Sequence, residues 1–222
     1  TLKLDAYVRG TRNLLVPSDV FQEKDDIEGP GINLGALLGQ YTLGEERAVG
    51  AELSAVYDRG PWNARLGIGS GRTFVRAPGR VQSGLRWRPS DLDVPFTLRG
   101  AMGWDSKTWT ATVATEWRSG YPISAPVARY RVGDPVEEDP VTYLYRPQVN
   151  NDRLSPYFRM DLIVGYTFQF LSAEWTATLN LFNATNRDNE LSRTYEPDGA
   201  GVDVSSQRGL PVLPLLELEM RL

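Results

Sequence analysis

The 222-residue chain contains no cysteine and no histidine, and these two absences exclude most catalytic and metal-binding chemistry. Without thiols there is no disulfide, cysteine-based zinc site or cysteine nucleophile. Without imidazoles there is no Ser–His–Asp triad and no histidine-containing metal site. The formal net charge is −4, whereas nucleic-acid-binding domains are usually basic. We therefore expect no enzyme, no nucleic-acid partner, no metal and no cofactor.

Long apolar runs are absent as well. No stretch approaches 18 consecutive apolar residues, which excludes a membrane-spanning helix. The chain opens at Thr1 without an initiator Met or a signal peptide, so we expect a processed or excerpted chain. The mean hydropathy of −0.35 taken alone would indicate a soluble all-β protein, an interpretation that the residue pattern has to support.

Alternation of apolar and polar residues with period two runs through the chain and predicts strands rather than helices. From Trp109 to Trp117 the odd positions are mostly apolar and the even positions mostly polar. From Phe158 to Phe170 every even position is a large apolar residue. We expect eight strands, near residues 1–9, 47–58, 61–76, 94–104, 107–119, 157–170, 174–184 and 213–222.

The connections between these segments alternate between short and long. Tight turns are expected at residues 58–61, 105–107 and 171–174, and long links at 10–46, 77–94, 120–156 and 185–209. Short turns at one end, long loops at the other and an even strand count are typical of outer-membrane barrels. We therefore expect an all-β fold, an antiparallel transmembrane β-barrel with eight strands in this chain, in the bacterial outer membrane.

Aromatic residues at the strand ends support a membrane location. Trp117 lies eight residues beyond Trp109, which is about 26 Å along a strand and about 20 Å in height at a tilt near 40°. This height is close to that of a lipid-facing apolar band, whose two borders carry aromatic belts. A soluble β-sandwich with a tryptophan core is the alternative, but its aromatics would not gather at strand ends. The expected belt residues are Trp62, Trp104, Trp109, Trp117, Phe158 and Trp175, with Phe96 beside Trp117.

The opposite, polar face carries charges of both signs and is expected to line the barrel interior. Its members are Arg65, Arg99, Glu116, Arg118, Arg159, Asp161, Glu217 and Glu219. They serve either as a charged wall or as contacts for a passing solute or an internal domain, and both interpretations remain open. The pair Glu217 and Glu219 fits a charge ladder better than a glycosidase site. The acidic clusters at residues 25–28 and 137–139 lack the spacing of a calcium loop.

Five segments, taken in order, resemble the TonB-dependent outer-membrane receptor family. Segment 153–168 contains the motif R-x-D-L, and segment 175–189 ends in N-x-x-N-R-x-N. Segment 117–122 contains S-G-x-P at a strand end, and segment 209–214 contains G-x-P-x-x-P at the entry to the last strand. The segments are 47–52 with 60–62, 117–122, 153–168, 175–189 and 209–214. The resemblance implies a barrel of about 22 strands with an N-terminal plug. Only eight strands of such a barrel, and no plug or TonB box, are expected in this chain.

The resemblance also implies a function. We expect the barrel wall and extracellular loops of a transporter for a scarce solute, such as a metal chelate, cofactor or glycan. The long loops from Gly10, Gly120 and Thr185 are the expected capture surfaces. Expected partners are outer-membrane lipid, the solute, and either the rest of a barrel with its plug or another chain. The alternative is a self-contained small barrel, or an anchor subunit with a structural or interaction role.

Overall fold

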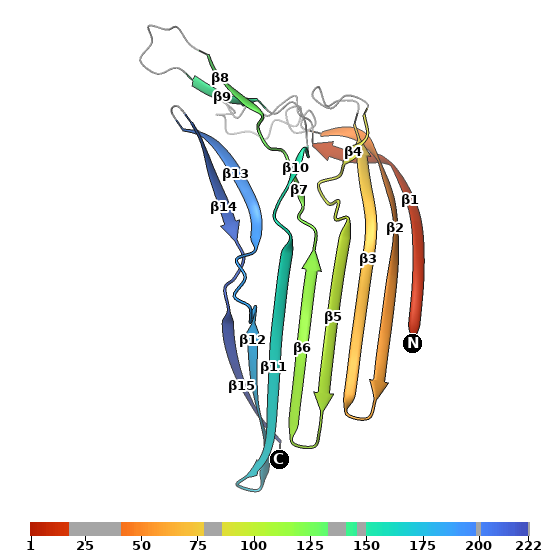
Figure 1. Ribbon diagram of the computed structural model, residues 1–222, viewed down its shortest axis with the longest axis vertical. Helices are drawn as coiled ribbons and strands as arrows, with labels where there is room; N and C mark the ends of the chain where they lie inside the picture. Colours follow the sequence, from red (N-terminus) through yellow and green to blue (C-terminus); the bar gives the residue numbers. More distant parts are fainter. Residues whose placement is uncertain (18–40, 78–85, 133–140, 146–149, 199–200, 222) are drawn as a thin grey trace, which may run out of the picture.

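The computed structural model describes residues 1–17, 41–77, 86–132, 141–145, 150–198 and 201–221. Eight long strands form one curved antiparallel sheet, shown in Figure 1. Their order in the sheet is β1 (Leu2–Pro17), β2 (Tyr41–Arg59), β3 (Trp62–Arg76), β5 (Phe96–Asp105), β6 (Trp109–Arg118), β11 (Tyr157–Phe170), β12 (Ala173–Phe182) and β15 (Leu213–Arg221). The prediction of an all-β antiparallel fold is confirmed, and each long strand overlaps one of the expected ranges.

Seven shorter strands were not expected from the alternation. They are β4 (Arg88–Pro89), β7 (Pro122–Ile123), β8 (Ala128–Val132), β9 (Val141–Tyr145), β10 (Asp152–Arg153), β13 (Glu190–Asp198) and β14 (Gly201–Arg208). All of them lie in the long links. Figure 1 shows β4 beside the last residues of β3, and the others beyond the ends of the long strands that lie opposite the short turns. Strands of two to five residues are too short to show a clear period of two in the sequence. The longer strands β13 and β14 pair with each other in a separate two-stranded sheet.

The described strands form an open sheet and not a closed eight-stranded barrel, which was one of the two alternatives that the sequence left open. Within the described ranges β1 pairs only with β2, and β15 pairs only with β12. Figure 1 places β1 and β15 at opposite sides of the sheet. The curvature accumulated over eight strands is therefore too small to bring the two edges together. Any closure needs further strands beyond those described.

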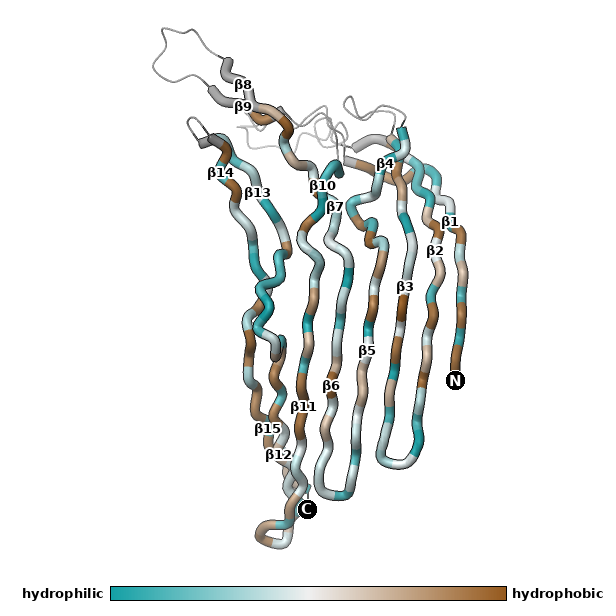
Figure 2. Tube along the Cα trace, viewed as in Figure 1, coloured by the Kyte–Doolittle hydropathy of each residue, from teal (hydrophilic) through white to brown (hydrophobic). Residues whose placement is uncertain are grey.

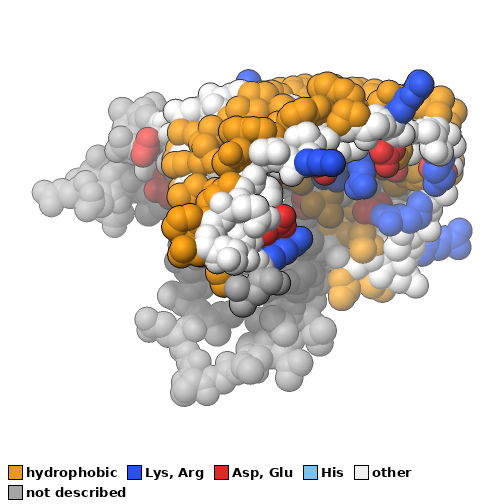
Figure 3. Space-filling view, turned by 90° about the horizontal axis from the view of Figure 1, so that it is seen from below, with side chains coloured by type: hydrophobic (Ala, Val, Ile, Leu, Met, Phe, Trp, Pro, Cys, Tyr) orange, Lys and Arg blue, Asp and Glu red, His pale blue; other side chains and the backbone are white. Residues whose placement is uncertain are grey.

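The two faces of the sheet differ in chemistry along their whole length. Figure 2 shows hydrophilic and hydrophobic residues alternating along each long strand, and Figure 3 shows hydrophobic side chains over the outer face and most charges in the hollow. Register fixes this arrangement, because Leu162 lies between Val113 of β6 and Leu181 of β12. The outer apolar side chains are exposed, with 85% of Val8 and 80% of Leu216 accessible.

Few apolar side chains are buried among the described residues, and three of them form a small cluster. Val16, Val75 and Ala77 pack together, with Leu14 against them, at the end of β1 and β3 away from the short turns. Among the residues that the structure describes, no helix is long and apolar enough to cross a membrane.

Candidate functional site

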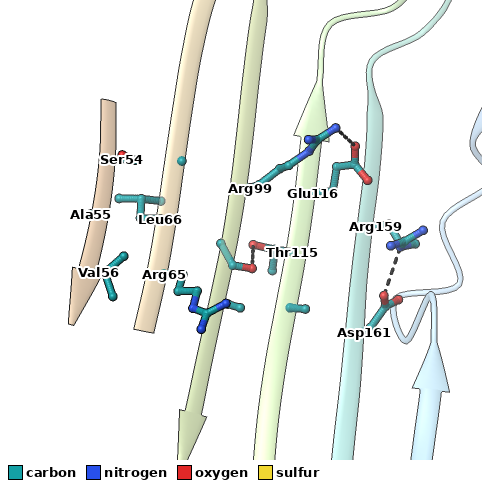
Figure 4. Close-up of a pocket in the computed structure, with 14 residues that line it drawn as sticks. Ser54, Ala55, Val56, Arg65, Leu66, Arg99, Thr115, Glu116, Arg159 and Asp161 are labelled. Atoms are coloured by element: carbon teal, nitrogen blue, oxygen red, sulfur yellow. Dashed lines mark hydrogen bonds and ion pairs between the residues drawn. The ribbon is translucent and has the colours of Figure 1, made fainter. Parts of the chain in front are cut away.

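The hollow face of the sheet carries a charged cavity at mid-height, shown in Figure 4. Five charged residues from four neighbouring strands line it, and its volume is about 460 Å³. They are Arg65 of β3, Arg99 of β5, Glu116 of β6, and Arg159 and Asp161 of β11. All five were expected on the barrel interior, and the register brings them together because Arg99 pairs with Glu116 and Glu116 with Arg159.

Two ion pairs neutralise most of the charge in this cavity. Arg99 Nη2 lies 3.4 Å from Glu116 Oε1, and Arg159 Nε lies 3.1 Å from Asp161 Oδ2. The Arg99 side chain is 75% exposed, so the first pair contributes little to stability. Arg65 has no carboxylate within 4 Å among the described residues. Three arginines against two carboxylates leave one net positive charge, which favours hydrated or anionic contents.

The remaining interior residues lie outside this cavity. Arg118, two residues beyond Glu116 on the same face, stacks between Tyr121 and Tyr157, with ring centroids 4.4 and 4.6 Å from its guanidinium carbon. Glu217 and Glu219 lie on β15 opposite Thr178 and Thr176. Glu219 pairs with Arg221 at 3.1 Å, so the two glutamates belong to the charged wall of the edge strand.

Aromatic residues near the short turns meet across strands on the outer face. Trp62 lies opposite Trp104 in the ladder between β3 and β5. The rings of Trp109 and Tyr166 are 4.5 Å apart, and Trp175 lies opposite Phe168. Tyr166 and Phe168 also belong to this group, beyond the residues expected from the sequence, and both share the face of Leu162.

A second aromatic group lies toward the other end of β5, β6 and β11. Trp117 lies opposite Phe158, and its ring meets that of Phe96 edge-on at 5.3 Å. These three residues are the ones expected to border the apolar band on its far side. The two aromatic groups therefore enclose a strip of Val, Leu, Met and Ala side chains on one face.

The asparagines after β12 form a clamp that ties the link to the main sheet. Asn183, only 1% exposed and with a φ of 49°, donates from Nδ2 to the carbonyls of Arg187 and Leu210 at 3.0 Å each. Its backbone N–H donates to Asp161 Oδ1 at 2.9 Å. Asp161 of the cavity is thus oriented from two sides, by Arg159 and by the clamp.

Asn189 completes the clamp because its side-chain amide forms two hydrogen bonds with the backbone of Phe158, as a residue of a neighbouring strand would. Its Oδ1 accepts from the Phe158 N–H at 2.9 Å, and its Nδ2 donates to the Phe158 carbonyl at 2.7 Å. The side chain therefore takes the place of a neighbouring strand beside β11 where β12 has already ended. This gives a structural reason for the asparagine spacing that carried the family resemblance.

Asp93 was not expected from the sequence as a functional residue, and it is the centre of a hydrogen-bond network that we call the Asp93 node. The Asp93 side chain is completely buried. The carboxylate accepts from the Thr73 N–H at 2.6 Å and Arg72 Nε at 3.2 Å, and also binds Arg153 Nη2. Arg153 Nη1 donates in turn to the carbonyls of Asp93 and Gly120, at 2.7 and 3.0 Å. The node joins β3, the segment before β5 and the segment before β11 above the cavity.

Gly120 lets two backbone segments approach closely beside this node. A Cβ atom at Gly120 would overlap the carbonyl oxygen of Leu154, a residue whose N–H donates to the Tyr121 carbonyl at 2.9 Å. Backbone atoms on both sides leave no room to shift. This contact explains the glycine in the S-G-x-P strand end.

Gly120→Ala is expected to lower the free energy of unfolding by about 1–3 kcal/mol, because the added methyl must push the two backbones apart. Urea unfolding of the protein in lipid vesicles measures the loss. Gly10→Ala is the control, since a Cβ there meets nothing within 4 Å. Equal losses in the two variants would contradict the steric explanation.

Glu190 anchors the β13–β14 hairpin to the segment before β11. Its carboxylate accepts from Arg193 Nε at 2.7 Å, from Ser206 Oγ at 2.8 Å and from the Ser155 N–H at 3.1 Å. The hydrogen bond from Arg193 is the main cause that lowers the pKa of Glu190 from 4.5 to about 2. The same contact raises the pKa of Arg193.

The anchoring by Glu190 should depend on pH. Because its pKa is lower in the folded protein, its contribution to stability is complete above pH 4.5 and is lost as the pH falls toward about 2. Glu190→Gln is expected to cost about 1.5–3 kcal/mol at neutral pH and to remove this dependence. Urea titrations across the acid range measure both effects. The exposed Glu196→Gln should retain the wild-type profile, and a profile unchanged by Glu190→Gln would refute the anchoring role.

Metal ligands do not cluster in the described part of the chain, where no group of three Asp or Glu residues could hold an ion. The acidic clusters at residues 25–28 and 137–139 lie outside the described residues, as does much of the expected capture loop from Gly10. Comparison with protein-family models, with curated proteins and with solved structures found no match to this chain.

Proposed function

We propose that this chain forms part of the wall and extracellular loops of an outer-membrane β-barrel transporter of the TonB-dependent type. The observation that carries the proposal is the contrast between the two faces of one sheet. The outer face is apolar and bordered by two aromatic groups, whereas the hollow face holds Arg65 and two ion pairs. A lipid-facing and a water-facing surface need this division.

A soluble sandwich would place a second layer over the apolar face. Among the described elements none packs over the outer side of β5, β6 and β11, and the small sheets lie beyond one end. Leu4 and Leu218 of the edge strands are 72% and 59% exposed. Exposed apolar surface on this scale favours a lipid environment. The solute is a scarce compound such as a metal chelate, cofactor or glycan, for which the charged hollow supplies a wet path.

These 222 residues contain no cysteine, so one introduced cysteine marks a single position within them. Thr112 and Val113 are neighbours on β6, and register places Thr112 on the hollow face and Val113 beside Leu162 and Met102 on the apolar face. In native membranes we expect a charged maleimide to label Thr112→Cys rapidly and Val113→Cys hardly at all. Equal labelling, or recovery of the complete protein in the soluble fraction, would overturn the proposal.

Orientation and transport are tested in the same cells. Thr194→Cys on β13 should be labelled from outside intact cells, whereas Lys107→Cys in a short turn should need permeabilised outer membranes. Cells with the complete protein should accumulate a labelled metal chelate, cofactor or oligosaccharide faster than a deletion strain. Correct labelling without any accumulation would favour the alternative of an anchor subunit with a structural role.

A further inference from the structure

Four arginines and one tryptophan gather on the apolar face near the end of β1, β2 and β3 that lies away from the short turns. We call Arg12, Arg47, Arg72, Arg76 and Trp87 the arginine patch. Register assigns the face: Arg47 lies two residues from Val49 on β2, and Val49 pairs with Val8 on one side and Arg72 on the other. The patch therefore continues the apolar rows rather than the charged hollow.

Cation–π contacts place two of these guanidinium groups over the ring of Trp87. The Trp87 ring centroid lies 4.5 Å from the guanidinium carbon of Arg47 and 5.0 Å from that of Arg76. Arg76 Nη2 also binds Glu45 Oε2 at 2.8 Å. A tryptophan face orients the planar groups. The N–H edge of Arg76 is occupied by Glu45, whereas that of Arg47 is available to an anion.

The arginine patch carries more positive than negative charge. Glu45 pairs with Arg76, and Asp93 is shared between Arg72 and Arg153. Counting Arg153 with the four arginines of the patch, five arginines minus two carboxylates leave three net positive charges. Arg12 and Arg47 are exposed, and the described residues include no carboxylate within 4 Å of either. Within the described residues, the guanidinium groups of Arg12 and Arg47 therefore remain available to an anionic partner on an otherwise apolar face.

The height of the patch corresponds to a membrane surface. Arg72 lies ten residues beyond Trp62 on the same strand and face. Ten strand residues span about 33 Å, or about 25 Å of height at a tilt near 40°, which is the thickness of the apolar band. With Trp62 at one border of the band, the patch lies at the other, among lipid headgroups.

We propose that the arginine patch binds the phosphate-bearing headgroup of an anionic lipid in the surrounding leaflet. This inference rests on the proposed membrane location. Guanidinium groups pair with phosphate oxygens through two parallel N–H bonds, and basic pockets at the membrane surface recognise such headgroups. The acyl chains follow the apolar rows below, past Val49 and Leu53 of β2 and Ile68 of β3. Continuity with these rows selects a lipid over a soluble phosphorylated ligand.

Native mass spectrometry of the complete protein in mild detergent tests the proposal, with phosphatidylglycerol as the anionic probe and phosphatidylcholine as the net-neutral probe. We expect tighter binding of phosphatidylglycerol and about fivefold weaker binding after Arg47→Gln, since one arginine at a membrane surface contributes about that factor. Arg59→Gln is the matched control, because Arg59 lies on the same strand and face at the opposite end. It should leave the high-affinity binding unchanged.

Three other outcomes would overturn the inference. Equal weakening in Arg47→Gln and Arg59→Gln would show general charge attraction, and equal affinity for the two lipids would show no headgroup recognition. The third is a protein that does not fractionate with membranes, in which case the proposed function fails together with the lipid site. Membrane fractionation of the wild type and of both variants distinguishes this last result from failure of the lipid site alone.

Discussion

Asp93→Ala is expected to lower the free energy of unfolding by about 3–5 kcal/mol, because it removes the acceptor shared by two guanidinium groups. The carboxylate is completely buried and receives Arg72, Arg153 and the Thr73 N–H. Without it, a charge that was paired in a buried site has no counter-ion, and a backbone N–H loses its acceptor. Urea unfolding of the protein in lipid vesicles measures the loss.

The neighbouring carboxylate of Asp91 provides the control. Asp91 is exposed and accepts one hydrogen bond, from Asn150 Nδ2 at 2.7 Å. Asp91→Ala should therefore cost about 1 kcal/mol or less. If Asp93→Ala does not refold, Asp93→Asn keeps the shape while removing the charge and should still be clearly less stable than wild type. Similar stability of the Asp91 and Asp93 variants would show that the buried node is not important for folding.

Leu162→Arg is expected to cost about 2–4 kcal/mol in a lipid bilayer, as arginine does on the lipid face of a barrel at mid-membrane. Leu162 lies on the outer face between Val113 and Leu181, midway along β11 and between the two aromatic groups. The added guanidinium would have to be dehydrated or reach either border of the apolar band. Folding titrations into vesicles measure this loss.

The next residue on the strand is the matched control. Ile163 pairs with Thr112 and Asn180 on the hollow face, so Ile163→Arg places the same charge in water. We expect its cost to be about 1 kcal/mol or less. Equal costs for the two variants would contradict the assignment of the faces, and a higher cost for Ile163→Arg would reverse it.

Alternation made the long strands and their faces predictable from the sequence. A period of two over ten or more residues, as from Phe158 to Phe170, leaves only one way to place a strand on a two-sided sheet. Arg99 and Glu116 were expected on the same face, and the register of β5 and β6 across their short turn makes them direct neighbours. The charged residues of the cavity were therefore identified before their distances were known.

Contacts between distant segments could not be predicted in this way. Asp93 meets Arg72 and Arg153 across 21 and 60 residues of sequence, and no local pattern marks it as buried. Gly120 and Leu154 meet across a long link. The asparagine clamp was visible as a spacing but not as a set of hydrogen bonds, because side-chain amides substitute there for a strand. Closure depends on accumulated curvature, which period-two patterns do not record.

Hydrogen exchange of the backbone amides in the edge strands β1 and β15 can report on what lies beside the sheet. In each of them alternate N–H groups point toward the one described partner, and the others point away from it. Amide hydrogens on the outward side of β1 exchange quickly where water lies beside them and slowly where another strand accepts them. Exchange along Leu2–Pro17 in native membranes therefore reports on the neighbour of this edge without any substitution. If fast and slow exchange alternate from one residue to the next, the edge of β1 is unpaired. If all amides of β1 exchange slowly, another strand continues the sheet.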